Sequence, residues 1–405
     1  MTRRHQLIGA IFVVAIAILA VGEFILQQAV EAQETGGSVR APRFEVDPFW
    51  PKPLPNHWVL GSAIGAWVDE RDHVWIIHRS SATLANQEKG AERKEAECCT
   101  GAPPVLEFDP NGNLVQSWGG PGQGYEWPQS NHGIFLDHKG NVWIGGNGAG
   151  DSHVLKFTRN GKFIAQYGKA GARRGANNAQ GQPTYPGNSI DPQNFGRVAK
   201  IVVDPRDNEA YLADGYLNKR VAVLDADTGK MKRYWGAYGN KPDDTNLGPY
   251  NPDAPPAQQF RNPVHCADVS NDGLVYVCDR ANDRLQVFRK DGTFVKEGFI
   301  ARRTLASGSV WDLAFSRDPQ QRYLFVVDGM NSRVWIVLRD TLEVVASFGD
   351  GGRQPGQFYG VHSIAIDSKG NLYTTETWEG KRLQKFVYRG IGTVPRSQGT
   401  VWPRS

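Results

Sequence analysis

Short apolar stretches recur along the chain, each followed by a polar turn and a second apolar stretch. The clearest copies begin at three histidines: HGIFLDHKGNVWIGG at His132, HCADVSNDGLVYVCD at His265 and HSIAIDSKGNLYTTE at His362. The aspartate, asparagine and glycine residues between the stretches are typical of tight turns. Strand-forming runs on both sides of such a turn indicate a β-hairpin. Each copy therefore predicts two paired strands.

The same hairpin pattern occurs three more times without the histidine, at Ile64 (IGAWVDERDHVWIIH), Ala199 (AKIVVDPRDNEAYLAD) and Trp311 (WDLAFSRDPQQRYLFVVD). A third apolar stretch follows each hairpin, such as RVAVL at Arg220, and most copies add a fourth, such as EVVASFG at Glu343. Six units of four short strands predict an all-β fold, a six-bladed β-propeller. A single blade cannot bury both of its faces, so the ring is expected to close as one domain.

We place this propeller at residues 43–392 and a C-terminal tail at residues 393–405. The segment from Arg43 to Leu60 is expected to add a strand that closes the ring. The repeated unit resembles the NHL family of propeller repeats. That resemblance implies a fold but no particular function.

Residues 1–32 have the layout of a targeting segment. Arg3 and Arg4 give it a positive start, and the apolar run Leu7–Val21 is short for a membrane span. Val30–Ala32 fits a small-residue cleavage site. We therefore predict a cleaved signal peptide and an exported protein, periplasmic or extracellular. An uncleaved membrane anchor is the alternative.

The net charge of +4 is small for 405 residues, and no basic stripe with interleaved aromatic residues is present, so nucleic acid is not expected as a partner. Export implies an oxidising compartment in which disulfides persist. Cys266 and Cys278 flank the predicted turn Asn271–Gly273 symmetrically and could pair across two strands. Cys98 and Cys99 are adjacent and could pair with each other, with a partner chain or not at all.

The three histidines share one position of the repeat, the start of the innermost strand of a blade. Round the ring this position reads Ile64, His132, Ala199, His265, Trp311 and His362. Alternate blades of a six-bladed ring lie about 120° apart, so the three imidazoles should converge. Three histidines with an open fourth position are typical of catalytic zinc sites. We predict a metal site with zinc favoured, and iron, copper or nickel as alternatives.

The second strand of each hairpin ends at the same rim of the channel as the histidines. The residues there are Arg79, Asn147, Tyr216, Arg280, Met330 and Trp378. A tyrosine beside an arginine can serve as a general base, and an arginine can bind a carboxylate. The structural alternative is that the arginines bridge blades and the tyrosine packs. Three long segments, Ser80–Pro104, Lys169–Arg197 and Ala237–Pro263, are expected to wall a pocket on this rim.

At these positions the chain resembles the peptidyl-α-hydroxyglycine α-amidating lyase family (peptidylamidoglycolate lyase). The matching motifs are HGIFLD at His132, PVHCADV at His265, VHSIAI at His362, DGYLN at Tyr216, WIIHRS at Arg79 and VCDRAND at Arg280. The resemblance implies zinc on the three histidines and cleavage of a carbinolamide into an amide and glyoxylate. It also implies Tyr216, Arg79 and Arg280 as catalytic residues. On this basis we expect Arg79 to hold Tyr216 as phenolate, and Arg280 to bind the substrate carboxylate or the reacting oxygen.

Two positions depart from the family pattern. Leu217 replaces a cysteine, so that disulfide is not expected. Ser363 replaces an aspartate that contributes to a structural calcium site, which argues against a bound calcium ion here. The expected partner is a small-molecule or peptide substrate with a C-terminal α-hydroxyglycine-like group, bound by a monomer. The first alternative is a non-catalytic NHL-repeat propeller that binds a protein or glycan and carries a structural metal. A calcium-dependent lactone hydrolase ranks last, because calcium prefers oxygen ligands.

Overall fold

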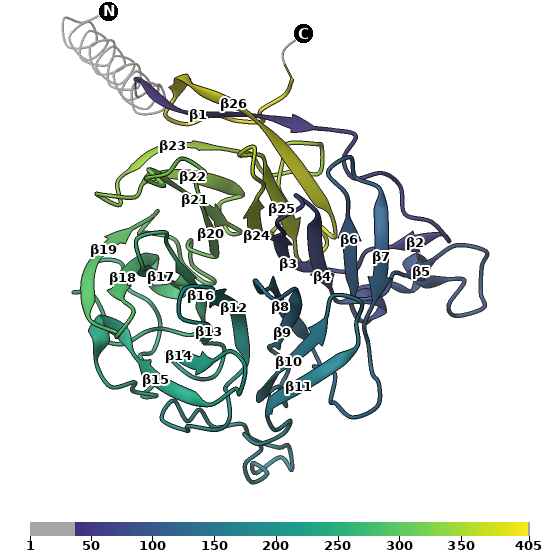
Figure 1. Ribbon diagram of the computed structural model, residues 1–405, viewed down its shortest axis with the longest axis vertical. Helices are drawn as coiled ribbons and strands as arrows, with labels where there is room; N and C mark the ends of the chain where they lie inside the picture. Colours follow the sequence, from purple (N-terminus) through teal and green to yellow (C-terminus); the bar gives the residue numbers. More distant parts are fainter. Residues whose placement is uncertain (1–36, 404–405) are drawn as a thin grey trace, which may run out of the picture.

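The computed structural model describes residues 37–403 and confirms the six-bladed propeller (Figure 1). Six four-stranded antiparallel sheets surround a central channel, and the first strand of each repeat lines it. The predicted signal segment lies outside the described residues. Within residues 37–403, no helix has the length and apolar character needed to cross a membrane.

Each blade runs from an inner strand at the channel to an outer strand at the surface. The first three blades contain β3 (Ala63–Val68), β4 (Val74–His78), β6 (Val105–Phe108) and β7 (Leu114–Trp118); β8 (Asn131–Leu136), β9 (Asn141–Gly146), β10 (His153–Thr158) and β11 (Phe163–Gly168); and β12 (Val198–Asp204), β13 (Glu209–Asp214), β14 (Arg220–Asp225) and β15 (Met231–Trp235). The last three contain β16 (Val264–Val269), β17 (Leu274–Asp279), β18 (Arg284–Arg289) and β19 (Phe294–Phe299); β20 (Asp312–Phe315), β21 (Tyr323–Asp328), β22 (Arg333–Leu338) and β23 (Val344–Phe348); and β24 (Val361–Ile366), β25 (Leu372–Glu376), β26 (Leu383–Pro395) and β1 (Ser38–Asp47).

An aspartate at the end of the inner strand shapes the hairpin turn of several blades. In the second blade, Asp137 Oδ1 accepts hydrogen bonds from the backbone N–H groups of Lys139 (2.9 Å) and Asn141 (2.8 Å). Its other oxygen accepts from the indole of Trp143 at 2.9 Å. The carboxylate therefore fixes the turn and ties it to the buried side chains between blades, which explains the recurrence of aspartate at this position.

The ring closes through the strand that precedes the first repeat. Strand β1 pairs antiparallel with β26, from Ser38 opposite Pro395 to Asp47 opposite Lys385, and becomes the outer strand of the last blade. These paired residues extend a few positions beyond the 43–392 span expected from the repeats. The C-terminal segment also adds a hydrogen bond from Val46 N–H to Val401 O at 2.7 Å. The first and last strands thus share one sheet.

The long segments between repeats contain little regular structure. Their elements are the parallel pair β2 (Trp58–Val59) and β5 (Thr100–Gly101), and the short 3₁₀ helices η1 (Ser80–Thr83), η2 (Asn86–Lys89) and η3 (Ala237–Gly239); a further one, η4 (Arg280–Asn282), begins at a rim residue. Both cysteine pairs form disulfides, Cys98–Cys99 and Cys266–Cys278. The second joins β16 to β17, as the symmetric spacing around the turn predicts.

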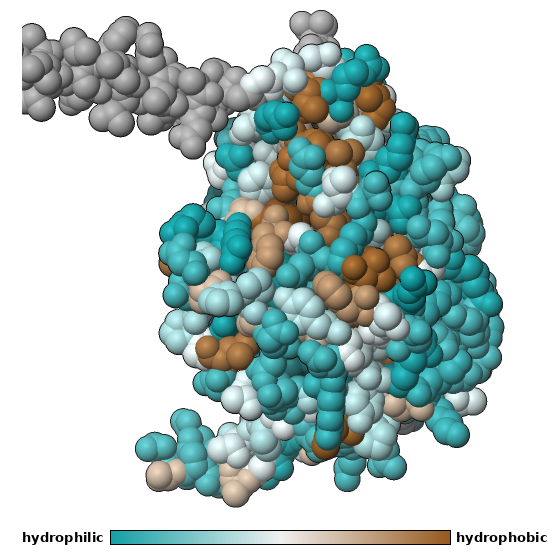
Figure 2. Space-filling view, turned by 90° about the vertical axis from the view of Figure 1, so that its left-hand side faces the viewer, coloured by the Kyte–Doolittle hydropathy of each residue, from teal (hydrophilic) through white to brown (hydrophobic). Residues whose placement is uncertain are grey.

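Buried apolar side chains fill the spaces between neighbouring blades and form the core. The largest are aromatic, and Trp75, Trp143, Trp311, Tyr211, Tyr276 and Tyr373 are each almost fully buried. The outer face in Figure 2 is mostly hydrophilic, with apolar side chains gathered toward the top of the view, where β1, β23 and β26 lie. The ring is therefore a rigid frame around its channel.

Candidate metal centre and active site

The three repeated histidines converge at one end of the channel, as the repeat predicts. His132, His265 and His362 begin or nearly begin β8, β16 and β24, and all three side chains are buried. Their ring centroids lie 4.8–5.1 Å apart, and their ligand nitrogens all lie within 4.8 Å of one another. A single cation can be held by three nitrogens gathered in this way.

A main-chain carbonyl of the next blade orients each imidazole. The Nδ1 atom of His132 lies 2.7 Å from Ala199 O, that of His362 lies 2.6 Å from Ile64 O, and that of His265 pairs with Trp311 O. A carbonyl accepts only, so each Nδ1 carries the proton and donates it. This leaves every Nε2 as a lone-pair donor, the tautomer that a metal requires.

The blades without histidine therefore serve the site through their backbone. Ile64, Ala199 and Trp311 occupy the same repeat position as the histidines. The strand register shifts at this position in the inner hairpins of blades one, two, three, four and six. Blade five is the exception, and there Trp311 N–H bonds to Val327 O at 3.0 Å. Such bulges re-aim a side chain or carbonyl out of the regular pleat, and they are common beside functional sites.

The electrostatic environment keeps the imidazoles neutral. Burial, followed by the positive charges of Arg280 and Arg79, lowers the pKa of His362 to about 3. Burial also lowers the pKa of His132 and of His265 well below the usual value for histidine. Because neutral imidazole is the metal-binding form, the donor set fits zinc or another late transition metal.

Tyr216 reaches the same point from the third blade. Its hydroxyl lies 3.0 Å from His132 Nε2 and 3.0 Å from His265 Nε2. The preceding Gly215 passes so close to the start of β16 that an added Cβ would lie 2.0 Å from Val264 O, so only glycine fits there. This close approach of the backbone places the Tyr216 phenol against the histidine cluster.

The two predicted arginines lie at the same rim but make hydrogen bonds to different partners. Arg280 Nη1 donates to the Tyr216 hydroxyl at 3.1 Å, and the guanidinium also lies 4.4 Å from the centroid of the Trp311 ring. Arg79 Nη2 donates instead to Asn147 Oδ1 at 2.9 Å. The hydrogen bond to the phenol therefore comes from Arg280 and not from Arg79, the arginine expected to hold Tyr216 as phenolate, because rotamers and not strand positions decide which arginine reaches it.

Buried ion pairs hold the turns that carry these residues. Asp214 and Arg220, on either side of the Tyr216 turn, pair at 2.8 Å with both side chains fully buried. Asp279 and Arg284 make the equivalent 2.8 Å contact around Arg280. Removing one member of such a pair would leave an uncompensated buried charge, so each pair disfavours rearrangement of its turn.

The long segments contact the rim turns. The segment 169–197 ends with Arg197, whose carbonyl accepts from Tyr216 N–H at 3.2 Å, and Asn262 of segment 237–263 donates to Gly215 O at 2.7 Å. A cavity of about 450 Å³ lies between the latter segment and the turn after Arg280, with Tyr250 and Ala281 among its lining residues. Two of the three long segments therefore contact the rim turns, and the cavity adjoins the turn after Arg280 without being lined by any of the three histidines.

The channel beneath the histidines does not fit the calcium ion that the family resemblance implies. The buried Lys200 ammonium lies 2.9 Å from Asp268 Oδ1 and 2.6 Å from Asp312 Oδ1. Burial alone would lower the pKa of Lys200, but the two carboxylates raise it. Ser363, in place of the family's aspartate, donates its hydroxyl to Asp312 at 2.7 Å. The Lys200 ammonium group therefore occupies the position between the two carboxylates that a calcium ion would need.

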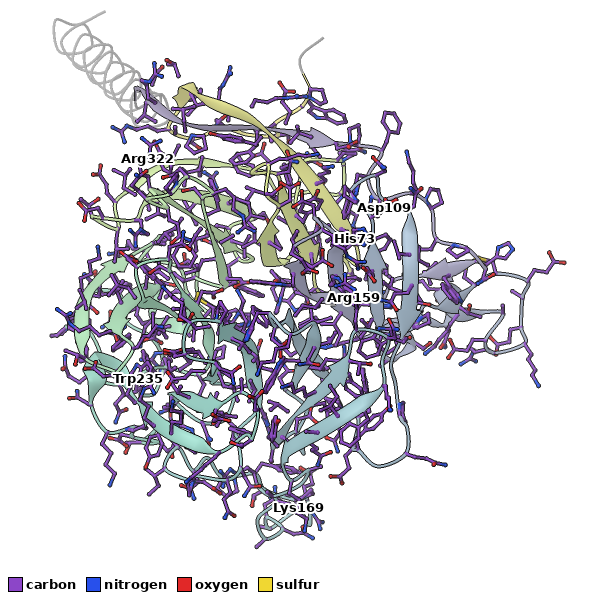
Figure 3. The ribbon with its side chains drawn as sticks, viewed as in Figure 1. His73, Asp109, Arg159, Lys169, Trp235 and Arg322 are labelled. Carbon is purple, nitrogen blue, oxygen red and sulfur yellow. A yellow bond between two sulfur atoms is a disulfide. The ribbon has the colours of Figure 1, made fainter. Side chains whose placement is uncertain are left out.

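A second acidic cluster near the turn of the first blade is also compensated. His73 Nδ1 lies 2.8 Å from Glu107 Oε1, and Arg71 and Arg159 each donate to the same oxygen at 2.8 Å. Arg159 also pairs with Asp69. Figure 3 shows His73 and Arg159 close together in the region of the first blade. Two guanidinium groups occupy the positions a cation would need, so the cluster is an ion-pair network.

The fold and this site define a class, an NHL-repeat six-bladed propeller with a three-histidine cluster in its channel. A streptogramin B lyase structure matches it with a TM-score of 0.50 at 11% identity, covering 88% of this chain and 99% of that chain. At this identity the likeness shows the fold alone. No protein-family model matches the chain.

Two kinds of known protein are similar to this chain in sequence. Peptidyl-glycine alpha-amidating monooxygenase B of Xenopus laevis is 27% identical over 228 residues, 56% of this chain and 22% of that protein. The Rattus norvegicus peptidylglycine alpha-amidating monooxygenase is 25% identical over 227 residues, again 56% of this chain but 20% of that protein. The chain thus matches about a fifth of these proteins. NHL repeat-containing protein 3 of Mus musculus is 25% identical over 308 residues, 70% of this chain and 73% of that protein.

Proposed function

We propose that the protein is a zinc-dependent carbon–nitrogen lyase, which cleaves a carbinolamide into an amide and glyoxylate. The observation that carries the proposal is the position of the Tyr216 hydroxyl, 3.0 Å from the Nε2 atoms of two histidines and 3.1 Å from a guanidinium nitrogen of Arg280. A phenol that merely packed in the channel would not need three polar partners of this kind. The distant similarity to amidating monooxygenases supports the same chemistry.

In the proposed reaction Tyr216 removes the proton from the substrate hydroxyl. The oxygen electrons form the carbonyl of glyoxylate, the C–N bond breaks, and the nitrogen keeps the bonding pair and takes up a proton to complete the amide. A zinc ion on the three imidazoles would supply Lewis acidity toward a substrate oxygen. Arg280 would stabilise the phenolate form of Tyr216, and Arg79, held by Asn147, would bind the substrate carboxylate.

Metal content and product release together test the proposal. The purified protein should contain about one zinc per chain and release glyoxylate from N-benzoyl-α-hydroxyglycine. His265→Ala should lose both the metal and the activity. His138→Ala, a change of an exposed histidine in a turn, is the matched control and should keep both. A metal-loaded, folded protein that releases no glyoxylate would exclude the lyase.

The second candidate is a binding propeller in which the metal is structural. The similarity to NHL repeat-containing protein 3 favours it, since that alignment covers more of both chains than the amidating enzymes do. In that case Tyr216→Phe would change neither metal content nor any partner binding. The glyoxylate assay separates the two candidates.

A further inference from the structure

The six rim positions divide into four polar ones and two apolar ones. Blades one to four present Arg79, Asn147, Tyr216 and Arg280, whereas blades five and six present Met330 and Trp378. Met330 is 40% exposed and Trp378 is 43% exposed. Leu305, in the loop before β20, is 57% exposed. We call Leu305, Met330 and Trp378 the apolar rim. Single exposed apolar side chains are common, but several that gather at the mouth of a site point to a binding surface.

The side chains of the apolar rim belong to neighbouring segments. The residue after Met330, Asn331, donates to Thr304 Oγ1 at 2.9 Å and so joins the Leu305 loop to the rim of blade five. A Cβ built on Gly329, the residue before Met330, would lie 2.9 Å from the indole of Trp311. The Trp311 ring in turn lies 5.5 Å from that of Trp378, edge to face. Trp311 therefore packs between the backbone next to Met330 and the ring of Trp378.

The backbone holds Trp378 in a strained conformation. Its φ of 50° lies in the left-handed region, where a bulky residue is a genuine outlier. Its carbonyl accepts from Ser62 Oγ at 2.9 Å, and its ring covers Gly360, where an added Cβ would lie 2.6 Å from the indole. Strain of this kind persists where surrounding contacts impose it, and it gathers at ligand sites.

The apolar rim adjoins the reactive groups through Trp311. Trp311 carries the Arg280 guanidinium on its face at 4.4 Å, and its ring lies 5.4 Å from that of His362. Its carbonyl also accepts the proton of His265 Nδ1. One indole therefore separates the apolar rim from a predicted metal ligand and from the arginine that contacts Tyr216. A substrate held at the histidines would extend over this surface on its way out of the channel.

We propose that the apolar rim is the seat for the group on the amide side of the substrate, and that this group is apolar, an aromatic or long aliphatic acyl chain. The inference rests on the proposed function for the direction in which the substrate lies. Polar groups in blades one to four would hold the carboxylate and hydroxyl end. The opposite end would then cover Trp378 and Met330 and exclude water from them.

Two pairs of compounds test the seat. In turnover, N-benzoyl-α-hydroxyglycine should have a kcat/KM at least about tenfold above that of N-acetyl-α-hydroxyglycine. Trp378→Ala should lower the value for the benzoyl substrate about tenfold, mainly through KM, and change the acetyl value less than about twofold. Trp378→Phe should restore most of the loss. Trp402→Ala, at a tryptophan that is 48% exposed, is the matched control and should change neither.

Binding without turnover separates this inference from the lyase. N-benzoylglycine and N-acetylglycine lack the hydroxyl and cannot react, so calorimetry on the zinc-loaded protein measures the seat alone. The wild type should bind the benzoyl compound about tenfold tighter, and Trp378→Ala should abolish the difference. Equal losses for both compounds in Trp378→Ala, or no preference in the wild type, would overturn the seat. If the preference is present but glyoxylate is not released, the seat stands and the lyase fails.

Discussion

Three main-chain oxygen atoms fix the imidazoles of the candidate metal centre. The histidines themselves can be predicted from the sequence, because His132, His265 and His362 stand at one position of a visible repeat. Their acceptors cannot, because a carbonyl is present at every residue whatever its side chain. The two arginines show the same limit. Strand positions place Arg79 and Arg280 at the rim, but only the side-chain rotamers show that Arg280 contacts Tyr216.

The first prediction concerns the phenol. Tyr216→Phe should leave the zinc content unchanged and reduce the rate of glyoxylate release by about 10²–10⁴, the usual contribution of a general base. Metal analysis and steady-state kinetics measure the two effects. Tyr125→Phe, which loses only a hydrogen bond to Gly120 O, is the matched control. An unchanged turnover rate in Tyr216→Phe would remove the base from the mechanism.

The second prediction concerns a buried carboxyl away from the metal. One oxygen of Asp283 accepts from Ser309 N–H at 2.8 Å, while Oδ2 is buried without a partner among the described residues. Burial, with a smaller effect of Asp328, raises the pKa of Asp283 to about 7. The folded state thus favours the protonated acid. The contribution of protonated Asp283 to the free energy of unfolding is complete below about pH 4. It is lost as pH rises from about 4 to 7.

Asp283→Asn should therefore remove the loss of stability that the wild type shows as pH rises. At pH 8 its free energy of unfolding should exceed the wild-type value by about 1–2 kcal/mol, allowing for solvent screening, and the difference should shrink at pH 5. Urea unfolding at the two pH values measures it. Asp340→Asn, at an exposed carboxyl, should show no such pH dependence. A gain that is equal at both pH values would contradict the titration argument.

At the scale of elements, the repeat predicted the strands well because each hairpin carries its own turn signal. The prediction that the segment from Arg43 to Leu60 contributes a closing strand is confirmed, although the strand itself is Ser38–Asp47. Its exact span depends on pairing with β26, more than 300 residues away, as in the hydrogen bond from Arg389 to Glu45 with a separation of 344 residues. No local pattern encodes such a partner.

The third prediction tests this closure. Phe44 of β1 is buried among Phe325, Phe348 and Tyr388 of the last two blades, at ring distances of 5.2, 5.4 and 5.8 Å. Phe44→Ala should lower the free energy of unfolding by about 3–5 kcal/mol. Phe49→Ala, five residues on at a side chain that is 78% exposed, should change it by less than about 0.5 kcal/mol. Similar effects for the two variants would argue against β1 as a structural closure.

At the scale of the whole molecule, contacts between blades decide what the channel can hold. The family resemblance implies that Ser363 stands where an aspartate contributes to a calcium site, but it does not show what lies beside the remaining carboxylates. Lys200 comes from the third blade, Asp268 from the fourth and Asp312 from the fifth. Only the closed ring brings the three together, so their relation could not be predicted from any one repeat.

The fourth prediction concerns this built-in cation. The melting temperature of the wild type should not change between millimolar calcium and a calcium chelator. Lys200→Ala should be destabilised by about 3–5 kcal/mol, since it leaves buried carboxylates unpaired. Calcium should then restore part of the lost stability, because it can bind the freed oxygens of Asp268 and Asp312. A wild type stabilised by calcium as strongly as the variant would show that the ammonium group does not replace the ion.

The alternation of imidazole and carbonyl round the channel has a consequence for how such rings can change. A ring with an odd number of blades would break the alternation at one place, and two supporting blades or two ligand blades would become neighbours. In either case the three imidazoles would no longer be spread evenly round the channel, although each would still have a main-chain carbonyl of the next blade as acceptor. Parity is therefore part of the chemistry: a descendant of this ring could gain or lose blades only in pairs if ligand and supporting blades are to keep alternating round the channel.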